Sequence, residues 1–297
     1  MSQKDKGEFT KLFGQPKTVI ESELPEREVV CCPLCDLVPQ VFAIDYQGFY
    51  LARCSRCKLE FHSPRPRFDQ LSEKIYAREY HTAEKDAGPG THRLTHFTRQ
   101  IQRLKQLVGS SGSILDVGCG DGSFLLFAKE SGWQVAGTDI YLSPAAEAIG
   151  IPLWAGRLED IDFGQQHFDV IRFHHVLEHT QNPLVDLRQA RKLLKQNGVL
   201  ILSVPNLAGI SPRLKSWQSR LRMKGRRWRH YAALHHFWFF TPPTLQLLVE
   251  AAQFTVVHWD TPVIAKGSTF PLVNKPMQFF LESFRLGSIL DFYCRPV

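Results

Sequence analysis

The chain has 297 residues, of which 43% are hydrophobic and 22% charged, and it carries a net charge of +7. These values predict a globular protein with one full α/β domain and a small additional module, and they exclude a predominantly disordered chain. No apolar run approaches the roughly 20 residues that cross a bilayer. Residues 1–30 are polar, contain no apolar signal segment and are expected to form a flexible tail. We therefore expect a cytoplasmic protein.

The first structured module is expected at the cysteines, five of which lie within residues 31–57. Two Cys-x-x-Cys pairs stand eighteen residues apart, with a predicted β-hairpin around Gln47-Gly48 between them. Each pair can direct two thiolates at one ion, and four thiolates complete a closed tetrahedral zinc site of the structural kind. The spacing thus predicts a zinc ribbon over residues 31–63. Its four expected ligands are Cys32, Cys35, Cys54 and Cys57.

Two neighbouring side chains are alternatives within this module. Cys31 adjoins Cys32 and is a second candidate for its place, although the Cys-Pro-Leu-Cys order makes the better metal-binding turn. His62 is expected to be a bystander. Residues 64–110 are expected to form a linker and helices, because apolar residues recur every 3.6 positions over residues 92–108.

From residue 113 onward, apolar runs typical of strands alternate with helical patterns. This alternation predicts a doubly wound, mostly parallel α/β sheet within a domain spanning residues 111–297. The predicted strands cover residues 114–117, 134–138, 153–154, 169–173, 199–204, 255–261 and 289–294. The predicted helices cover residues 123–131, 184–195 and 244–252.

A glycine-rich turn after the first of these strands carries the main functional signal. Leu115–Gly122 reads Leu-Asp-Val-Gly-Cys-Gly-Asp-Gly, in which glycines let a ligand approach the backbone closely. A nicotinamide-binding turn has different glycine spacing and binds a pyrophosphate. Asp116 would repel such an anion but suits a ligand carrying a sulfonium and an ammonium group. Asp139, which closes the next strand, can accept hydrogen bonds from ribose hydroxyls.

These residues resemble a known family. Leu115–Gly122 resembles motif I of the class I S-adenosylmethionine-dependent methyltransferases, and Asp139 matches the acidic residue that closes their second strand. The likeness is greatest to the branch that includes the ubiquinone-biosynthesis O-methyltransferases. It implies a Rossmann-like sheet of seven strands and S-adenosylmethionine as cofactor. The likeness continues through Gly156–Asp160, Phe168–Ile171, Val176–His179, Gly198–Leu200, Ser203–Asn206 and His235–Thr241.

The resemblance also implies cofactor-binding roles. It places the glycines of the turn and Asp116 at the methionine moiety, Asp139 at the ribose, Leu158 and Glu159 at the adenine, and two histidines beside the sulfonium. Tyr80, in a Tyr-x-x-x-Tyr segment, is expected to cover the cofactor. The complete expected set is Tyr80, Asp116, Gly118, Cys119, Gly120, Gly122, Asp139, Ile140, Leu158, Glu159 and His174, with His175 adjacent.

Histidines are the candidate catalytic residues. His179 is the first candidate base because imidazole titrates near neutrality, and His175 and His235 are further candidates. The alternative is that Glu178-His179 only positions the helix after the fourth strand. The ubiquinone enzymes have Glu-x-x-Glu-His here and are associated with a divalent cation, whereas this chain has His175 at the first position. Two histidines and a glutamate could still bind a transition metal, but magnesium prefers carboxylates, so we expect no catalytic magnesium.

Residues 211–230 form a basic insert with eight basic residues and no acidic residue, and without it the chain would be close to neutral. Leu214, Trp217, Leu221 and Trp228 interrupt the basic residues at roughly helical spacing. Four interpretations stay open: an amphipathic helix on an anionic membrane or lipid-linked acceptor, a phosphate-binding lid, an RNA contact, or a solvated basic face.

Three functions follow from these features. The favoured one is methyl transfer to a hydroxyl of a small molecule, glycan or lipid-linked intermediate. The second is an RNA methyltransferase that uses the ribbon and the basic insert. The third is a cofactor-binding scaffold without turnover, which the intact Asp116 and Asp139 disfavour.

Overall fold

The computed structural model describes residues 26–68, 91–223, 225–231, 235–263 and 275–297. Tyr76 and Tyr80, and with them the predicted cover of the cofactor, lie outside these residues. The described strands are β1 (Arg27–Glu28), β2 (Gln40–Ile44), β3 (Tyr50–Arg53), β4 (Glu60–His62), β5 (Arg65–Pro66), β6 (Ser113–Val117), β7 (Gln134–Asp139), β8 (Leu153–Ala155), β9 (Phe168–His174), β10 (Leu194–Pro205), β11 (Trp238–Phe239), β12 (Phe254–Asp260) and β13 (Ile289–Pro296). The described helices are α5 (Thr91–Leu107), α6 (Ser123–Glu130), α7 (Pro144–Glu147), η2 (Leu177–His179), α8 (Pro183–Leu193), α9 (Ile210–Arg220), η3 (Arg229–Tyr231), α10 (Pro242–Ala251) and α11 (Lys275–Ser283).

A seven-stranded sheet forms the centre of the molecule, with the order β12-β13-β10-β9-β6-β7-β8. Strands β10, β9, β6, β7 and β8 run parallel to one another, whereas β13 is antiparallel to both β10 and β12. This arrangement confirms the predicted doubly wound, mostly parallel sheet. Because β7 and β8 lie on one side of β6 and β9 on the other, the carboxyl end of β6 is the point where the strand order reverses, and ligands bind at such points.

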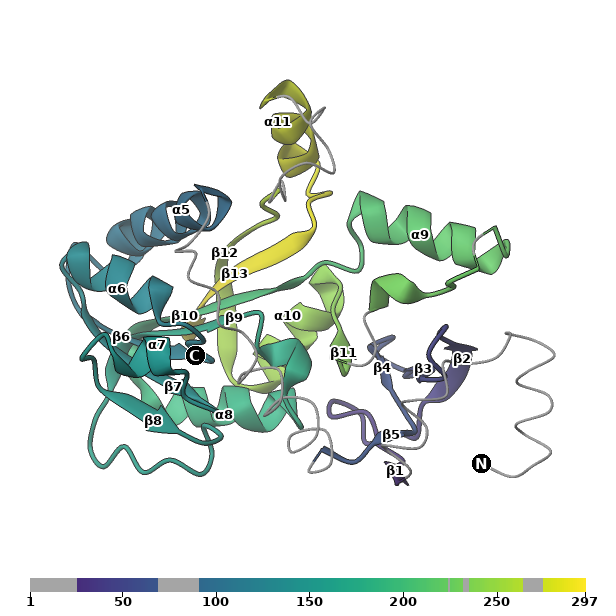
Figure 1. The fold of residues 1–297 in the computed structure, drawn as a ribbon, viewed down its shortest axis with the longest axis horizontal. Coiled ribbons are helices and arrows are strands. Elements are labelled where there is room, and N and C mark those ends of the chain that lie inside the picture. Colours follow the sequence, from purple (N-terminus) through teal and green to yellow (C-terminus); the bar gives the residue numbers. More distant parts are fainter. Residues whose placement is uncertain (1–25, 69–90, 224, 232–234, 264–274) are drawn as a thin grey trace.

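Helices cover both faces of this sheet (Figure 1). On one face, Phe97 and Leu104 of α5 and Phe124 of α6 pack against the central strands. On the other face, α8 and α10 contribute buried leucines such as Leu187 and Leu245. The observed α5 matches the helix expected at residues 92–108, since its apolar positions recur at the period of an α-helix.

The ribbon is built into the larger domain rather than tethered to it. The predicted hairpin is present as β2 and β3, and β4 extends it. The fourth strand, β11, comes from a distant part of the chain. It pairs antiparallel with β4 and places Trp238 opposite Phe61. Strand β1 falls within the predicted tail but pairs with β5, so residues 27–28 are part of the folded structure.

The basic insert packs on the same small sheet. Trp228 and Tyr231 join Phe49, Leu51 and other ribbon residues in one buried cluster. The Tyr231 hydroxyl donates a hydrogen bond of 2.6 Å to Oε2 of Glu60. The insert is thus anchored to the ribbon by one side. No helix within the described ranges is long and apolar enough to cross a membrane.

His62 is a buried polar residue inside the ribbon's aromatic cluster. Its ring stacks on Phe49 with centroids 5.6 Å apart, and among the described residues neither ring nitrogen has a hydrogen-bond partner. Burial lowers the pKa of His62 to about 3, and the charges of Arg65 and Arg27 act in the same direction. It does not belong to the cysteine cluster described below, in agreement with its expected bystander role.

We expect the substitution His62→Phe to stabilise the protein, most clearly in mild acid. The unfolded chain protonates this histidine near its ordinary pKa of 6.5, whereas the folded protein protonates it only near pH 3. The free energy of unfolding therefore does not depend on His62 protonation above pH 6.5 and decreases as the pH falls from 6.5 towards 3. The substitution should add about 1–3 kcal/mol at neutral pH by removing unsatisfied nitrogens, and about 1.4 kcal/mol more per pH unit below 6.5. Thermal unfolding at pH 7.5 and 5.5 measures this, with the exposed His167→Phe as control. A variant that is less stable at both pH values would contradict the prediction.

Candidate active site

A cavity of about 1020 Å³ opens at the carboxyl ends of β6, β7, β8 and β9. The segments that form it come from distant parts of the chain, because parallel strands bring their carboxyl ends to one edge of the sheet. Its described lining comprises Glu28–Pro33, Asp36, Arg65, Phe68, Val117-Gly118, Thr138–Ile140, Gly156–Glu159, His175-Val176, His179–Asn182, Asp186 and His235-His236.

The glycine turn between β6 and α6 needs its glycines for two different reasons. Gly118 has φ +71°, and a Cβ there would lie 2.2 Å from Cγ2 of Val176, so only glycine fits. Gly120 has φ +57°, but a Cβ there would meet no described atom within 4 Å. The backbone at Gly120 therefore borders open space that a ligand can approach.

Asp139 lies at the end of β7 and lines the cavity. Its Oδ2 accepts a hydrogen bond of 2.9 Å from the backbone N–H of Gly120, which ties the two strand ends together. Ile140 follows it in the wall. Leu158 and Glu159, expected at the adenine, line the cavity beyond β8. This placement brings together the residues expected at the ribose and adenine.

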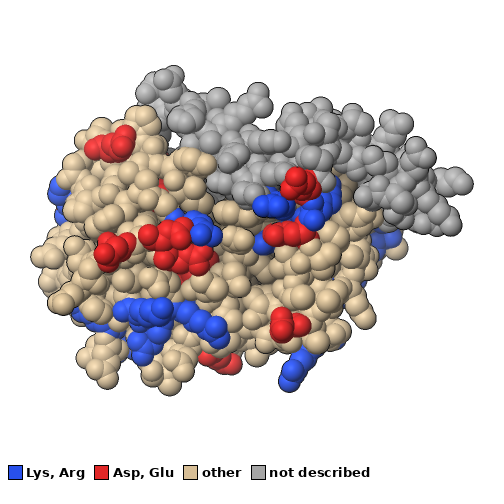
Figure 2. All heavy atoms as spheres, turned by 90° about the horizontal axis from the view of Figure 1, so that it is seen from below, with Lys and Arg blue, Asp and Glu red and all other residues tan. Residues whose placement is uncertain are grey.

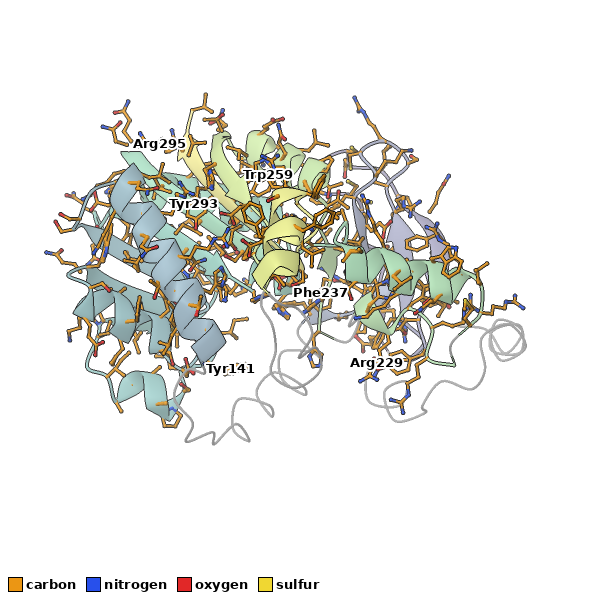
Figure 3. The ribbon with its side chains drawn as sticks, turned by 90° about the horizontal axis from the view of Figure 1, so that it is seen from above. Tyr141, Arg229, Phe237, Trp259, Tyr293 and Arg295 are labelled. Carbon is orange, nitrogen blue, oxygen red and sulfur yellow. The ribbon has the colours of Figure 1, made fainter. Side chains whose placement is uncertain are left out.

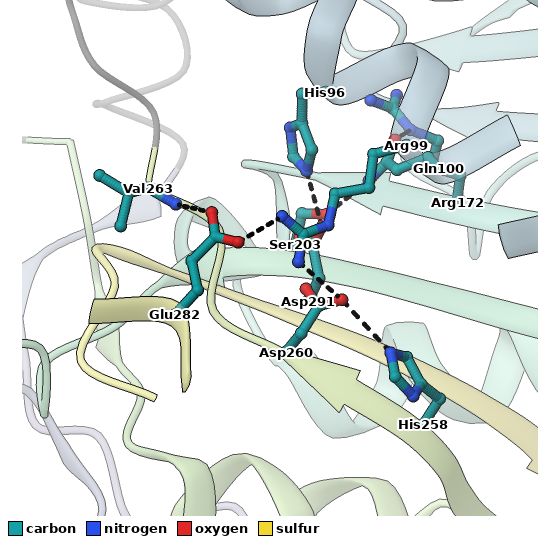
Figure 4. Close-up of polar contacts among 10 residues, drawn as sticks. All are labelled: His96, Arg99, Gln100, Arg172, Ser203, His258, Asp260, Val263, Glu282 and Asp291. Carbon is teal, nitrogen blue, oxygen red and sulfur yellow. Dashed lines mark hydrogen bonds and ion pairs between the residues drawn. The ribbon is translucent and has the colours of Figure 1, made fainter. Parts of the chain in front are cut away.

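Asp116 is placed differently from the expectation that it faces the cofactor. It is buried, is not among the lining residues, and its Oδ1 accepts a hydrogen bond of 2.7 Å from Nη1 of Arg172 on β9. Burial raises the pKa of Asp116 to about 6, although the Arg172 charge acts against this. Arg172 also donates to Oε1 of Gln100, whose amide donates to Oγ of Ser203 (Figure 4). These buried hydrogen bonds thus connect Asp116, next to the glycine turn, to β9, α5 and β10.

Histidines and one glutamate form a cluster beside the turn. Glu178 is fully buried, and its Oε1 lies 3.1 Å from Nδ1 of His175. Burial disfavours the Glu178 carboxylate, yet the hydrogen bond from His175 and the adjacent histidines lower its pKa. His175 adopts φ +55°, a backbone conformation that is uncommon for a non-glycine residue and concentrates at functional sites. Glu178, His179 and His236 each offer one possible ligand atom, and these three atoms lie within 4.8 Å of one another. These three residues can therefore hold a metal ion.

The orientation of His179 determines its chemistry. Its Nδ1 lies 2.7 Å from the backbone carbonyl oxygen of His235. Because a carbonyl can only accept, Nδ1 carries the proton, and Nε2 of the neutral ring is the basic atom. Burial lowers the pKa of His179, so the neutral form persists to a lower pH than usual. His179 lines the cavity and is therefore placed to accept a proton from a bound molecule.

The four predicted cysteines meet in one cluster. Their Sγ atoms all lie within 4.8 Å of one another, close to the edge of about 3.8 Å that a tetrahedral ZnS₄ site requires. The two pairs have the same backbone geometry. Asp36 N–H donates to Cys32 O and Lys58 N–H donates to Cys54 O, and both residues have positive φ. Cys31 is not one of the four.

The thiols of the cysteine cluster differ in how readily they lose their protons. Burial opposes the thiolate of Cys54, but hydrogen bonds from the backbone N–H groups of Cys57 and Arg56 outweigh it and lower its pKa to about 7. A metal requires the thiolate form. Burial raises the pKa of Cys57 to about 11 and that of Cys32 further still, so a bound cation would have to displace protons from these two thiols. The donor set and its spacing fit a zinc ion.

The ribbon contributes directly to the cavity wall. Cys31, Cys32, Pro33 and Asp36 line it, so the first cysteine turn and the cavity share a boundary. Arg65 connects the parts: its Nε donates to Glu28 over 2.7 Å and its Nη2 donates to the backbone carbonyl of Gln181. Sequence reasoning missed this junction, although the Ser-Pro-Arg-Pro segment after the ribbon marks its position.

Half of the predicted cofactor residues that the structure describes line the cavity, and the other half are outside its lining. Gly118, Asp139, Ile140, Leu158 and Glu159 line it, as do the catalytic candidates His175, His179 and His235. The residues that are not in the described lining are Asp116, Cys119, Gly120, Gly122 and His174. Burial strongly raises the pKa of Cys119, so it is a small apolar residue of the turn. Sequence reasoning missed Arg172 and His236, and only the proximity of His236 to His235 in the sequence could have indicated the latter.

The fold and the cavity define the class of protein. A parallel sheet with an acidic residue at the second strand end, a glycine turn at the first, and an antiparallel seventh strand is the architecture of the class I methyltransferases. The model of the methyltransferase domain family matches residues 90–259, more than half of the chain. The protein belongs to this family.

Similar proteins have varied acceptors. The ubiquinone biosynthesis O-methyltransferase of Actinobacillus pleuropneumoniae serotype 7 is 33% identical over 118 residues, 35% of this chain and 50% of that protein. The tRNA U34 carboxymethyltransferase of Idiomarina loihiensis is 25% identical over 205 residues, 63% of this chain and 60% of that protein. The chain spans about half the length of the curated ubiquinone relatives it matches.

Among solved structures, the chain is similar to the 1,6-didemethyltoxoflavin-N1-methyltransferase of Burkholderia thailandensis, crystallised with S-adenosylhomocysteine. The TM-score is 0.56 at 17% identity, covering 87% of this chain and 99% of that one. A plantazolicin methyltransferase in complex with S-adenosylhomocysteine gives a TM-score of 0.53 at 16% identity, covering 77% and 94%. At this identity, the similarity establishes the shared fold.

Proposed function

We propose that this protein is an S-adenosylmethionine-dependent methyltransferase that acts on a hydroxyl of a small molecule, glycan or lipid-linked intermediate. The main support for the proposal is that Asp139, Gly118 of the glycine turn and the oriented His179 line the same cavity. The cofactor half and the proton-accepting half of the reaction thereby share one space. Family membership and relatives with methyltransferase names support the same conclusion.

The cofactor would lie across the ends of β6, β7 and β8. Gly118 and the open space at Gly120 suit its methionine moiety, Asp139 and Ile140 its ribose, and Leu158 and Glu159 its adenine. S-adenosylmethionine, when bound, supplies an electrophilic methyl group on its sulfonium. Asp116 would not contact the cofactor directly. Through its hydrogen bond with Arg172 it would hold the ends of β6 and β9 in place.

The residues of the chain would provide orientation and proton removal. Nε2 of His179 would accept the acceptor's hydroxyl proton, while the carbonyl of His235 holds the ring by its other nitrogen. The buried carboxylate of Glu178 would stabilise the imidazolium that forms, because His175 and His179 are its neighbours. His175 would position Glu178 through the 3.1 Å contact.

The charges of the cavity support a neutral acceptor. Five acidic side chains line it, those of Glu28, Asp36, Asp139, Glu159 and Asp186. Burial raises the pKa of Asp186 to about 7, so this group is only partly ionised at neutral pH. Against them stand the guanidinium groups of Arg65 and Arg157. A phosphorylated acceptor would be repelled, whereas the cationic cofactor would be attracted. No described residue of the basic insert is part of this lining, which argues against its use as a phosphate-binding lid.

An RNA methyltransferase is the second candidate. The run of basic residues without an acidic one in 213–229 and the similarity to a tRNA-modifying enzyme favour it. Salt-sensitive RNA retention that is lost when Arg226, Arg227 and Arg229 are changed to alanine would support this candidate.

We also propose that Cys32, Cys35, Cys54 and Cys57 hold a structural zinc ion. The matched backbone geometry of the two turns and the convergence of four sulfurs within 4.8 Å support this proposal. The ion would fasten the ribbon turn that borders the cavity, and all four positions are taken by protein ligands, so it would have no open position for chemistry.

Calorimetric titration with S-adenosylmethionine and S-adenosylhomocysteine tests the cofactor assignment. We expect micromolar affinity and a loss of about 100-fold or more in Asp139→Ala, because hydrogen bonds to a charged group are worth about 1.5–3 kcal/mol each. Asp139→Asn keeps an acceptor for the Gly120 N–H and separates lost ligand contacts from a disturbed turn. The exposed Asp162→Ala serves as control. A folded, zinc-loaded protein that binds neither compound would refute the enzyme assignment and favour a scaffold.

A further inference from the structure

Helix α9 exposes an apolar stripe on its outer side. Ile210, Leu214, Trp217 and Leu221 follow one another at intervals of four, three and four residues, which places them on one helical face. Each is half exposed, with 50–54% of its surface accessible, and Met223 next to them is 60% exposed. Residues of this kind are normally buried, so a contiguous exposed stripe marks an interaction surface.

The stripe cannot be the side by which the insert packs onto the protein, because another side does that. Ser219 is buried and its Oγ accepts a hydrogen bond from the backbone N–H of Trp228. The backbone N–H of Tyr46 in the ribbon donates to the carbonyl of Arg227. Trp228 and Tyr231 fill the ribbon's aromatic cluster. The helix is therefore held with its apolar stripe facing outward.

A second group of exposed apolar side chains lies on helix α11 and directly after it. Phe279, Phe280 and Phe284 are 75%, 52% and 63% exposed. The two segments meet where the backbone N–H of Ile210 donates to the carbonyl of Leu286 over 3.1 Å. In Figure 1 both helices project from the upper side of the molecule, and the view from above in Figure 3 places both facing the reader.

The charges around the stripe have a single sign. The described basic residues Arg213, Lys215, Arg220, Arg222, Arg226 and Arg229 are exposed, and the insert has no acidic residue. Glu282 on α11 pairs with Arg99 at 3.0 Å, which offsets its charge. By contrast, the face seen from below in Figure 2 shows acidic and basic side chains side by side.

We propose that α9, residues 221–223 and 225–229, and the exposed Phe279, Phe280 and Phe284 form a docking surface for an anionic lipid bilayer. Aliphatic and aromatic side chains would enter the boundary between headgroups and acyl chains, while the flanking cations contact lipid phosphates. The exposed apolar stripe favours a bilayer over RNA, since phosphate contacts on RNA use the cations but leave leucine and phenylalanine in water. The surface is separate from the cavity lining, so docking leaves the cavity residues unchanged.

Vesicle flotation of the full protein tests the proposal. We expect binding to vesicles of phosphatidylcholine that contain about 30–40% phosphatidylglycerol, and release of the protein from them by high salt. Binding to vesicles of pure phosphatidylcholine should be weak. Changing Arg213, Lys215 and Arg220 to glutamine should weaken binding on the order of 100-fold, at about 1 kcal/mol per charge. Changing Trp217 and Leu221 to serine should weaken it about tenfold or more while the charge is unchanged.

Matched controls separate docking from general stickiness. Leu247→Ser with Val257→Ser removes two exposed apolar side chains outside the surface and should leave binding unchanged. Cofactor titration of each variant shows whether the fold and cavity are intact, so failure to bind vesicles is distinguishable from failure of the enzyme assignment. Absence of flotation with anionic vesicles, or tight tRNA binding in a filter assay that the Trp217 and Leu221 changes leave intact, would overturn the proposal.

Discussion

Loss of the proposed zinc ion from the cysteine cluster is expected to destabilise the protein and to weaken its affinity for the cofactor. A structural zinc ion contributes about 10–16 kcal/mol of apparent binding free energy, much of which is folding free energy. We expect Cys54→Ser or a strong chelator to lower the thermal midpoint by about 10 °C or more. Because Cys32 and Pro33 border the cavity, affinity for the cofactor should fall as well.

Cys31→Ser provides a matched control for this prediction. Cys31 adjoins Cys32 and lines the cavity, but it is not a member of the cluster. Its substitution should leave the midpoint within about 2 °C, the range of an ordinary surface change. Metal analysis should find one zinc per chain in the wild type and in Cys31→Ser and none in Cys54→Ser. A metal-free wild type with the same midpoint would contradict the zinc proposal.

Replacing His179 with alanine is expected to lower kcat by about 10²–10⁴-fold, the usual contribution of a general base. Cofactor affinity should change little, since the role proposed for the ring is toward the acceptor and not the cofactor. The measurement is the initial rate of S-adenosylhomocysteine formation, with an acceptor found by screening hydroxylated sugars and lipid-linked glycans. His167→Ala, at an exposed histidine away from the cavity, is the control.

A second variant distinguishes His179 from His235. His235 holds His179 through its backbone carbonyl, which His235→Ala retains, so this change should cost less than about fivefold if His179 is the base. A loss of 10²-fold or more in this variant, about the effect expected of a base, would assign the role to His235 instead. Loss of activity on chelation with the cysteine cluster still loaded would indicate a metal at Glu178, His179 and His236.

The pH profile gives an independent check on His179. Burial lowers its pKa below the ordinary 6.5, and a general base must be unprotonated. The rate kcat/KM should therefore be level at neutral pH and fall on the acid side with a midpoint below 6.5. The acid limb should disappear in the residual activity of His179→Ala. A midpoint above 6.5 would contradict the assignment, because it would require a partner that stabilises the imidazolium more than burial disfavours it.

The sequence determined the features that are local in the chain. Each of these features occupies only a few consecutive residues. They are the glycine turn at Leu115–Gly122, the acidic end of the next strand at Asp139 and the two Cys-x-x-Cys pairs. Their chemistry depends on spacing along the backbone, so the fold class and the sulfur cluster were predictable and are observed. The alternation of strand and helix is likewise a local periodicity.

Only the tertiary structure decided how distant residues meet. Arg172 reaches Asp116 across two neighbouring strands, and the carbonyl of His235 orients a histidine 56 positions earlier in the chain. Strand β11 completes the ribbon sheet from a distant part of the sequence, beyond β10. These contacts arise from the pairing of strands and the packing of layers around them, where a residue's partners depend on the whole fold and leave no periodic signal in the chain.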